Sequence, residues 1–439
     1  IPCTALSLAA PPSTAALPVS ASPLLATSWI WVCAVHSGTW LAEACADASC
    51  HTGTVFSQAS PFRDGHRRNE HPMLPLLRKR SRATVALDIG SNKVKCVRID
   101  HSGEAPMLTH FAMVDLLPEA IVDGEIMDRD MVVEAIRECV GRAGIPENRV
   151  VSAVGGRSVI VKKILMDKMT QADAKEAILW EAEQHVPFEI DDISLDFQII
   201  NEDVGADQME ILLVAARKET VQQHIELLRD AELDPEIVDV YAFAVQNAFE
   251  AAVGGAGDEV VALMDVGGDN TNLTILRDGT PHFTRDIPTG ANFVVEQFQK
   301  RFGLNDEDAR RATVNPGEFD NIDQDQIVEV ITDVAEELAT GLERSLSFLR
   351  TSGEVEAIDR VVLTGGGSQF EGLATLLGQR SELPVESCDP LGAVDYDPEI
   401  FDQYQVDEIA PMLSVGIGLG LRRTGDPVSY THLRAHETS

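Results

Sequence analysis

Short apolar runs that lead into glycine turns recur along this chain. Val85 and Leu87 share one face of a predicted strand at period two, and Gly90 then permits a tight turn into a second strand. The same order of apolar strand, acidic residue, glycine and new apolar run returns at 261–275. A third apolar run, at 361–364, passes through three glycines toward a predicted helix. The pattern predicts an α/β protein organised around three glycine-containing turns.

Between these turns, apolar residues repeat at helical or strand spacing. Thr170 and Asp173 are typical of a capping box that opens a helix, and Trp180 inside that helix is interpreted as a packing residue. The change in composition between residues 155 and 231 indicates a small inserted domain. The patterns predict helices at 128–143, 170–185, 218–230, 241–252 and 326–350, and further strands at 106–114, 149–154, 159–166, 196–201 and 209–216.

Composition and charge narrow the possible functions. The chain has 439 residues, of which 44% are hydrophobic, enough to form cores in two or more domains. Its formal net charge of −36 argues against nucleic acid as a partner, because most of the surface would repel a phosphate backbone. The seven cysteines show no metal-binding spacing, so Cys96, Cys139 and Cys388 are interpreted as small buried hydrophobic residues.

The two ends of the chain differ from the part between them. Residues 1–72 lack an initial Met, are rich in Ala, Ser and Pro, and are interpreted as non-native upstream translation or as disordered. Met73 is the expected native start, and the apolar and basic stretch 73–82 is expected to be a solvated terminus. Residues 427–439 resemble a vector-derived tail and are left out of the reasoning about the fold.

The three glycine turns share one chemical interpretation. Glycines allow backbone N–H groups to approach phosphate oxygens, and the neighbouring Ser and Thr hydroxyls add donors. Asp88 and Asp265, each at the end of a predicted strand, would repel a phosphate but can hold the water shell of Mg²⁺. Two such hairpins and a glycine-rich turn therefore predict a cleft that binds a nucleoside triphosphate with Mg²⁺.

The order of these motifs resembles the superfamily of actin, sugar kinases and heat-shock chaperone ATPases. Within it, the run Glu181-Ala-Glu-Gln-His-Val-Pro-Phe188 is similar to the PilM family of type IV pilus assembly proteins. The resemblance covers roughly residues 73–424. Four other stretches agree with it: Leu195–Phe197, Ile211–Lys218, Phe283–Gly290 and Leu363–Leu373.

This resemblance implies an actin-like ATPase fold, made of two duplicated βαβ-type domains with an FtsA-like 1C insertion. It also implies a cytoplasmic, nucleotide-binding scaffold at the inner face of the inner membrane, with possible self-association. The implied partner is the short cytoplasmic N-terminus of a PilN-like inner-membrane protein. The expected subdomains are 1A at 73–154 and 232–256, 1C at 155–231, 2A at 257–294 and 356–426, and 2B at 295–355.

The family's functional residues carry over to defined positions of this sequence. Asp88 and Asp265 would coordinate hydrated Mg²⁺. The outer phosphates of ATP would be held from one side by Gly90, Ser91, Asn92 and Lys95, and from the other by Gly267, Gly268 and Thr271, while Gly365, Gly366 and Gly367 would face the α-phosphate and the nucleoside.

Three positions depart from the family's pattern or leave a choice open. Arg310 and Thr313 stand where the family places a Glu and a Lys that meet the ribose and base. Asp239 either orients a water near the γ-phosphate or caps the following helix, and the sequence does not decide between these roles.

Two other functions remain as alternatives to the scaffold. A small-molecule kinase of the same superfamily would need a carboxylate base beside an acceptor pocket, and the insertion offers no recognisable one. An FtsA-like cell-division protein would end in an amphipathic membrane helix, which the segment 420–425 does not resemble. The expected activity is at most a slow ATPase.

Overall fold

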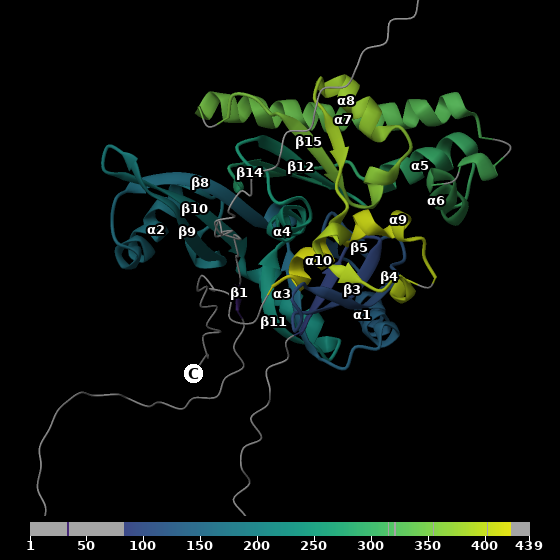
Figure 1. Ribbon diagram of the computed structural model, residues 1–439, viewed down its shortest axis with the longest axis horizontal. Coiled ribbons are helices and arrows are strands. Elements are labelled where there is room, and N and C mark those ends of the chain that lie inside the picture. Colours follow the sequence, from purple (N-terminus) through teal and green to yellow (C-terminus); the bar gives the residue numbers. More distant parts are fainter. Residues whose placement is uncertain are drawn as a thin grey trace, which may run out of the picture.

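Two large β-sheets, each with helices packed on it, form the body of the protein (Figure 1). The computed structural model describes residues 33–34 and 83–422, except 315, 320, 321, 354 and 402. The expectations for the stretch 73–82 and for the tail 427–439 lie outside the described residues, as does the expectation for 1–72 apart from its two-residue strand. The predicted α/β class is confirmed.

The first sheet has the strand order β1-β11-β7-β2-β3-β4-β17. The central strand β2 is covered on both faces. Val85 and Leu87 pack with α1 (Arg129–Ala143) and α3 (Lys218–Asp230), whereas Ala86 packs with α4 (Tyr241–Val253) and α10 (Ser414–Gly420). The strands are β1 Cys33–Ala34, β2 Ala83–Ile89, β3 Lys93–Asp100, β4 Met107–Asp115, β7 Arg149–Val154, β11 Asp234–Val240 and β17 Asp395–Tyr396.

The second sheet has the strand order β16-β15-β12-β13-β14-β8-β10-β9. One face of its first five strands is covered by the long helix α7 (Gln324–Ser352) together with α5 (Ala291–Phe302) and α8 (Leu373–Ser381). The strands are β8 Val159–Asp167, β9 Ile193–Gly205, β10 Gln208–Arg217, β12 Val260–Val266, β13 Thr271–Arg277, β14 Thr280–Ile287, β15 Arg360–Thr364 and β16 Val385–Ser387.

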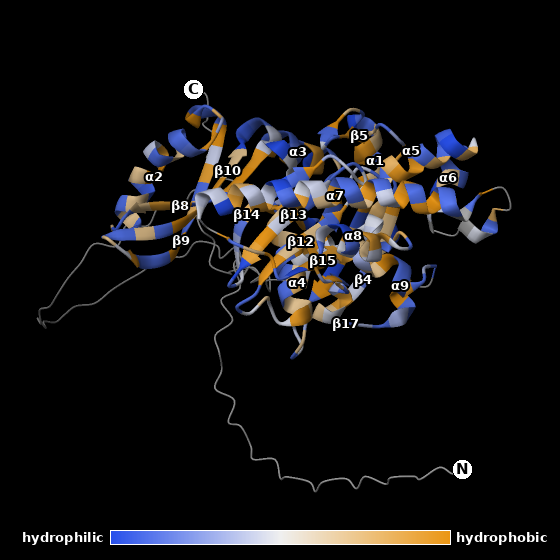
Figure 2. Cartoon of the chain, turned by 90° about the horizontal axis from the view of Figure 1, so that it is seen from above, coloured by the Kyte–Doolittle hydropathy of each residue, from blue (hydrophilic) through white to orange (hydrophobic). Residues whose placement is uncertain are grey.

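Helix α7 shows how the apolar pattern becomes a buried stripe. Figure 2 shows hydrophobic and hydrophilic residues alternating along this helix, which lies over the second sheet. A helix buries one face in this way when its apolar residues recur every three or four positions. The predicted stripe is confirmed, since all of its members are buried: Ile327, Val330, Ile331, Val334, Leu338, Leu342 and Leu349.

The strands of the insertion extend the second sheet, whereas its helix α3 packs on the first sheet. Its strands β8, β10 and β9 continue the second sheet, through a pairing of Phe283 in β14 with Lys162 in β8. The pairing gives β14 a neighbour on a side where its backbone N–H and C=O groups would otherwise meet solvent. The insertion therefore contacts both sheets, with its three strands in the second sheet and its helix α3 on the first.

The C-terminal segment is also divided differently from the expected subdomains. Residues 356–426 were assigned to subdomain 2A, but β17 pairs with β4 of the first sheet. Helix α10 packs in the same core as Val97 and Ile99 of that sheet. Within this segment, β15, β16, α8 and the glycine turn that follows β15 pack with the second sheet and its helices.

Helix α2 (Gln171–His185) begins as predicted but carries one exposed aromatic residue. The backbone N–H of Asp173 donates to the Thr170 hydroxyl at 3.2 Å, which confirms the N-terminal cap. Trp180, interpreted above as a packing residue, is 72% exposed, so that interpretation was wrong. The buried side of the helix consists of small and aliphatic residues, namely Ala174, Ile178 and Ala182.

Candidate functional site

A cavity of about 1280 Å³ opens where the glycine turns of the two sheets meet. Its walls also include the short hairpin β5–β6 (Ile121–Val122 and Glu125–Ile126), the start of the insertion and part of helix α6 (Asp306–Val314). The structure therefore brings together most of the residues that the sequence singled out. Those lining the cavity are Gly90, Ser91, Asn92, Lys95, Asp265, Gly267, Gly268, Gly366, Gly367, Arg310 and Thr313.

The first hairpin joins β2 to β3 at the cavity wall. The backbone N–H of Gly90 donates to the carbonyl of Lys93 at 3.0 Å, which closes the turn. Lys95 donates from Nζ to Asp88 Oδ2 at 2.6 Å and to the carbonyl of Met412 at 3.0 Å. Asp88 is only 3% exposed and is not among the residues lining the cavity, so it lies behind Lys95.

Asp265 reaches the cavity from β12 of the second sheet. The hydroxyl of Tyr241 donates to its Oδ2 at 2.7 Å. Burial raises the pKa of Asp265 to about 6, an effect that Asp88 increases and that the Tyr241 hydrogen bond and Lys95 oppose. Asp265 is therefore a desolvated carboxylate, and the positive charge of Lys95 on the first sheet partly compensates its negative charge.

The third glycine turn packs closely against this carboxylate. Gly365 has φ +83°, and a Cβ there would lie 2.2 Å from Asp265 Oδ1. Gly367 is similarly restricted, because a Cβ would lie 2.4 Å from Cγ1 of Val266. A side chain at either position would displace β12, so the glycines are required for the shape of the site. A 3₁₀ helix (Gly366–Gln369) follows, and α8 begins only at Leu373.

The second hairpin, between β12 and β13, touches the first. A Cβ on Gly268 would lie 2.8 Å from Nδ2 of Asn92 and 3.1 Å from Oγ of Ser91. Thr271, assigned to the phosphates by resemblance, is fully buried and donates its hydroxyl to the carbonyl of Thr289 at 2.6 Å. The backbone of Gly267 and Gly268 lines the cavity, whereas Thr271 does not.

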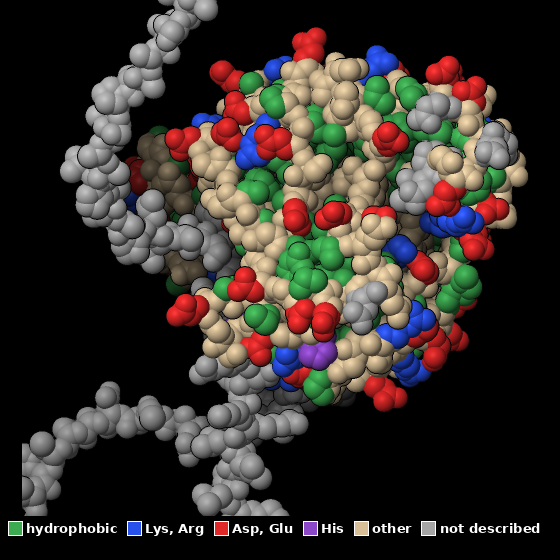
Figure 3. Space-filling view, turned by 45° about the vertical axis from the view of Figure 1, so that its right-hand side comes forward, with side chains coloured by type: hydrophobic (Ala, Val, Ile, Leu, Met, Phe, Trp, Pro, Cys, Tyr) green, Lys and Arg blue, Asp and Glu red, His purple; other side chains and the backbone are tan. Residues whose placement is uncertain are grey.

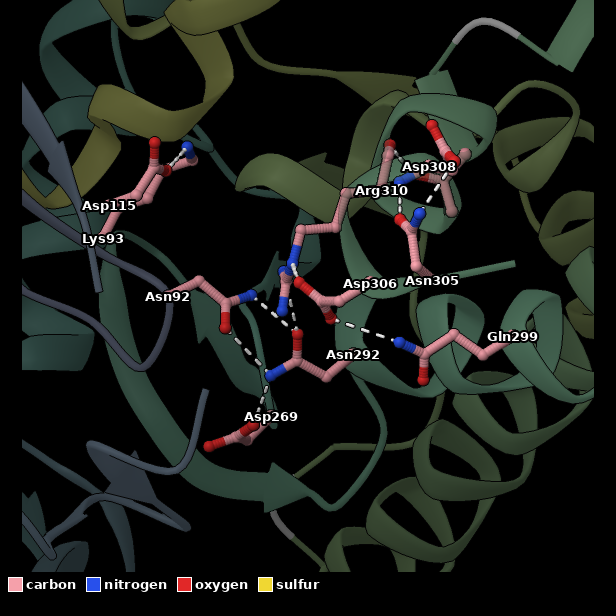
Figure 4. Close-up of polar contacts among 11 residues, drawn as sticks. Asn92, Lys93, Asp115, Asp269, Asn292, Gln299, Asn305, Asp306, Asp308 and Arg310 are labelled. Carbon is pink, nitrogen blue, oxygen red and sulfur yellow. Dashed lines mark hydrogen bonds and ion pairs between the residues drawn. The ribbon is translucent and has the colours of Figure 1, made fainter. Parts of the chain in front are cut away.

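A polar network crosses the cleft between the first hairpin and α5 (Figure 4). Asn92 and Asn292 exchange two amide hydrogen bonds, of 2.8 and 3.0 Å. Asn292 also donates to Asp269 Oδ1 at 2.7 Å. Arg310 donates to Asp306 at 2.8 Å and reaches the carbonyl oxygen of the Asn292 side chain at 3.4 Å. Asn292 and Asp269 were missed by the sequence reasoning. Asp269 lies within the second glycine turn, directly after Gly268, and that position could have identified it, whereas Asn292 lies outside all three turns.

Asp239 lies outside the residues that line the cavity. Its Oδ2 accepts hydrogen bonds from Nε of Arg422, at 2.9 Å, and from Nη2 of the same residue. Burial raises the pKa of Asp239, and the guanidinium opposes that shift. Tyr241, two residues further on, lines the cavity instead. Its position directly after a strand, like those of the glycine turns, is the signal that could have identified it.

These donors fit a nucleotide bound together with a divalent cation. The backbone of three glycine turns and the ammonium of Lys95 face the same cavity as one buried carboxylate. No group of three His, Cys, Asp or Glu side chains within the described residues could hold a metal ion by itself. A hard cation here would therefore take most of its oxygen ligands from phosphate and water, which is how Mg²⁺ commonly binds.

Comparison with known proteins shows which family, solved structure and curated proteins this chain is similar to. The model of the family described as type IV pilus assembly protein PilM matches residues 86–424. A solved PilM–PilN type IV pilus biogenesis complex is similar, with 31% identity, coverage of 77% of this chain and 98% of that one, and a TM-score of 0.68. The cell division protein FtsA of Bacillus subtilis (strain 168) is 22% identical over 334 residues, which are 66% of this chain and 75% of that protein. FtsA of Buchnera aphidicola is also 22% identical, over 67% of this chain and 81% of that protein.

Proposed function

The chain belongs to the PilM family of type IV pilus assembly proteins, and from this premise we propose that it is a nucleotide-binding scaffold. The predicted actin-like ATPase fold is confirmed by these relatives. We propose that ATP with Mg²⁺ binds in the cavity between the two sheets. We further propose that a PilN-like inner-membrane protein binds to the same scaffold, on the insertion side of this cavity.

The observation that carries the proposal is the meeting of the three glycine turns around Asp265 and Lys95. The backbone N–H groups near Gly90, Gly267 and Gly366 would bind phosphate oxygens, and Lys95 would balance their charge. Asp265 would hold the water shell of the cation, with Asp88 as a second, deeper carboxylate. Bound Mg²⁺ would neutralise part of the negative charge of the phosphates.

The base and ribose would lie on the side of α6. Arg310 and Thr313 line that part of the cavity, and the guanidinium of Arg310 is held by Asp306 and Asn292. A guanidinium held by two such hydrogen bonds can stack on a purine ring or donate to ribose oxygens. We therefore propose that Arg310 replaces the family's usual contacts to the nucleoside rather than leaving them unmade.

For the partner, we propose a site on the insertion side of the cavity. That side is formed by Gly155–Ser158, Arg217, Glu219 and Thr220, with the short hairpin β5–β6 opposite. An extended peptide can bind in such a groove through backbone hydrogen bonds, with pockets selecting its side chains. Figure 3 shows acidic side chains spread over the face it displays, and the whole chain carries a net charge of −36. This charge favours a partner peptide that carries Lys or Arg beside apolar anchors.

The partner anchors the scaffold at the membrane in this proposal. Among the residues that the structure describes, none of the helices is both long enough and apolar enough to cross a bilayer. We propose a cytoplasmic position at the inner face of the inner membrane, set by the PilN-like protein. The subdomain boundaries 1A, 1C, 2A and 2B are retained as part of this proposal, apart from the two strand pairings described above.

Thermal unfolding tests the nucleotide site. ATP with Mg²⁺ at a hundredfold excess over its Kd should stabilise the wild-type protein by about 2.7 kcal/mol. Asp265→Asn should lose most of this stabilisation, since the amide cannot hold the cation's water shell. The matched control is Asp333→Asn, which removes an exposed carboxylate on α7 that pairs with Arg301. An equal ATP effect in Asp265→Asn and the wild type would contradict the site.

Peptide titration tests the partner site separately. A fluorescent peptide from the cytoplasmic leader of a PilN-like protein should bind the wild type, and Glu219→Arg should weaken binding several-fold by repelling its basic residues. Glu219 lines the cavity in the first turn of α3, whereas Glu226, exposed on the same helix, does not. Glu226→Arg is therefore the matched control. Equal loss in both variants would indicate a general charge effect and place the partner elsewhere.

A further inference from the structure

Tyr241 joins the two halves of the protein at the cavity floor. It is the first residue of α4 and directly follows β11, a strand of the first sheet. Its hydroxyl donates at 2.7 Å to Oδ2 of Asp265, which lies on β12 of the second sheet. The bond therefore connects a side chain of one half to the carboxylate that the other half presents to the cavity.

The tyrosine ring is held in place by its surroundings. A Cβ on Gly155 would lie 2.8 Å from Cβ of Tyr241, so the chain passes directly against the tyrosine where it leaves β7 for the insertion. The ring lines both the main cavity and a smaller one of about 240 Å³ at the base of the insertion. Gly155 therefore restricts the base of the tyrosine side chain, and the hydrogen bond to Asp265 orients its hydroxyl end.

The hydroxyl acts only as a donor in this arrangement. Burial, and after it the negative charge of Asp265, raise the pKa of Tyr241 well above its usual range. The carboxylate accepts this hydrogen bond through Oδ2, while its Oδ1 lies against Gly365, whose missing side chain leaves the required space. Both oxygens of Asp265 are thus oriented by named neighbours.

We propose that Tyr241 is a positioning residue for cation-dependent nucleotide binding. Its hydroxyl fixes the rotation of the Asp265 carboxylate, so that Oδ1 is presented toward the glycine turn Gly365–Gly367 and the phosphates. Because Tyr241 directly follows a strand of the first sheet and Asp265 lies on the second, the carboxylate has this rotation only when the two halves are closed to the observed degree. The inference rests on the proposed binding of a nucleotide with a divalent cation.

Affinity measured with and without the cation tests this role. Tyr241→Phe keeps the ring and its packing against Gly155 but removes the hydrogen bond. A fluorescent ATP analogue is titrated against the full chain, once with excess Mg²⁺ and once with EDTA. We expect the Mg²⁺-dependent gain in affinity to fall about tenfold in Tyr241→Phe, the effect of losing one hydrogen bond to a charged group, while affinity in EDTA stays unchanged.

The control variant is Tyr404→Phe. Tyr404 packs its ring on Phe111 far from the cavity lining, and removing its hydroxyl should change neither affinity. Thermal melting of each variant without ligand shows that it is folded. A general structural role of Tyr241 would lower the affinities in Mg²⁺ and in EDTA by the same factor, and that result would overturn the inference.

The remaining outcomes separate the inference from the proposed function. If the wild type binds the nucleotide with Mg²⁺ dependence and Tyr241→Phe keeps that dependence in full, the inference alone is wrong. If the wild type binds without any dependence on the cation, the positioning role is also wrong, although the nucleotide site survives. If the wild type binds no nucleotide, the proposed function fails and the inference fails with it.

Discussion

Asn92 and Asn292 exchange two side-chain hydrogen bonds across the cleft, each amide both donating and accepting. Asn92 lies in the first hairpin and Asn292 in the first turn of α5, so the pair ties the turn between β2 and β3 to the helical layer of the second sheet. Asp269 and Arg310 complete the hydrogen bonding of Asn292. The amide pair therefore forms a polar bridge across the cleft, in addition to the apolar core that Val261 and Leu263 of the second sheet share with Ala86 of the first.

A double-mutant cycle on this pair should show coupling. Asn92→Ala, Asn292→Ala and the double variant are unfolded with denaturant, and the free energies of unfolding are compared. Because two hydrogen bonds join the residues, we expect a coupling energy of about 1–3 kcal/mol. Additive effects within a few tenths of a kcal/mol would show that the two amides do not depend on each other in solution.

The buried pair of Asp239 and Arg422 should make a large contribution to stability. Arg422 is 2% exposed and its partner 1%, so Arg422→Met leaves an uncompensated carboxylate in the core. We expect a loss of about 3–5 kcal/mol in the free energy of unfolding, with partial recovery in Asp239→Leu/Arg422→Met. Arg137→Met, which breaks an exposed pair with Glu134, is the control and should cost under about 1 kcal/mol. A cost for Arg422→Met no larger than the control's would contradict the buried pair.

Stability should fall in mild acid, partly because of His224. Its ring hydrogen-bonds the hydroxyl of Ser152 at 3.0 Å, and burial lowers its pKa to about 4. The unfolded chain, with a pKa of about 6.5, binds the proton first. The contribution of neutral His224 is therefore fully present above about pH 6.5 and is lost as the pH falls toward 4.

His224→Gln can keep a bond to Ser152 without titrating, so its free energy of unfolding should decline less between pH 6.5 and 4 than that of the wild type. His282, whose pKa burial also lowers to about 4, leaves part of the slope in place. The pKa of Asp265 is raised from 3.8 to about 6 in the folded protein, so this group makes the free energy of unfolding rise as the pH falls between those values. The effect is the same in the wild type and in His224→Gln, and it therefore cancels when the two are compared. Identical pH profiles would show that His224 takes up no proton on unfolding in this range.

ATP turnover should be slow. Phosphoryl transfer depends on a positioned water or acceptor and on stabilisation of charge. Asp239, the candidate for orienting a water, is hydrogen-bonded to Arg422 and is not among the residues that line the cavity. We expect a turnover number below about 1 s⁻¹, the low end for enzymes, in a phosphate-release assay. The Asp265→Asn variant measures any contaminating activity. Faster turnover that Asp265→Asn abolishes would favour the kinase or ATPase alternatives over a scaffold.

Much of this protein could be determined from local pattern. A short apolar run that leads into a glycine turn placed β2, and helical periodicity placed the buried stripe of α7, because whether a strand or a helix face is buried depends mainly on its own residues. The glycine turns could be identified in the same way, since their backbone geometry excludes side chains wherever the chain folds back, as at Gly365 with its φ of +83°. These short-range constraints account for the three turns that line the cavity.

Only the tertiary structure decided which distant residues meet. The pairing of Phe283 with Lys162 joins the insertion to the second sheet, although β8 and β14 are separated by most of the insertion, α3, β11 and α4. In the same way, the guanidinium of Arg422 donates hydrogen bonds to Asp239, and it is Tyr241 rather than Asp239 that donates to Asp265. Strand propensity and periodicity do not specify the neighbour of an edge strand or the partner of a buried charge. Those choices depend on which pairing leaves the fewest backbone groups and charges unsatisfied once the whole chain is packed.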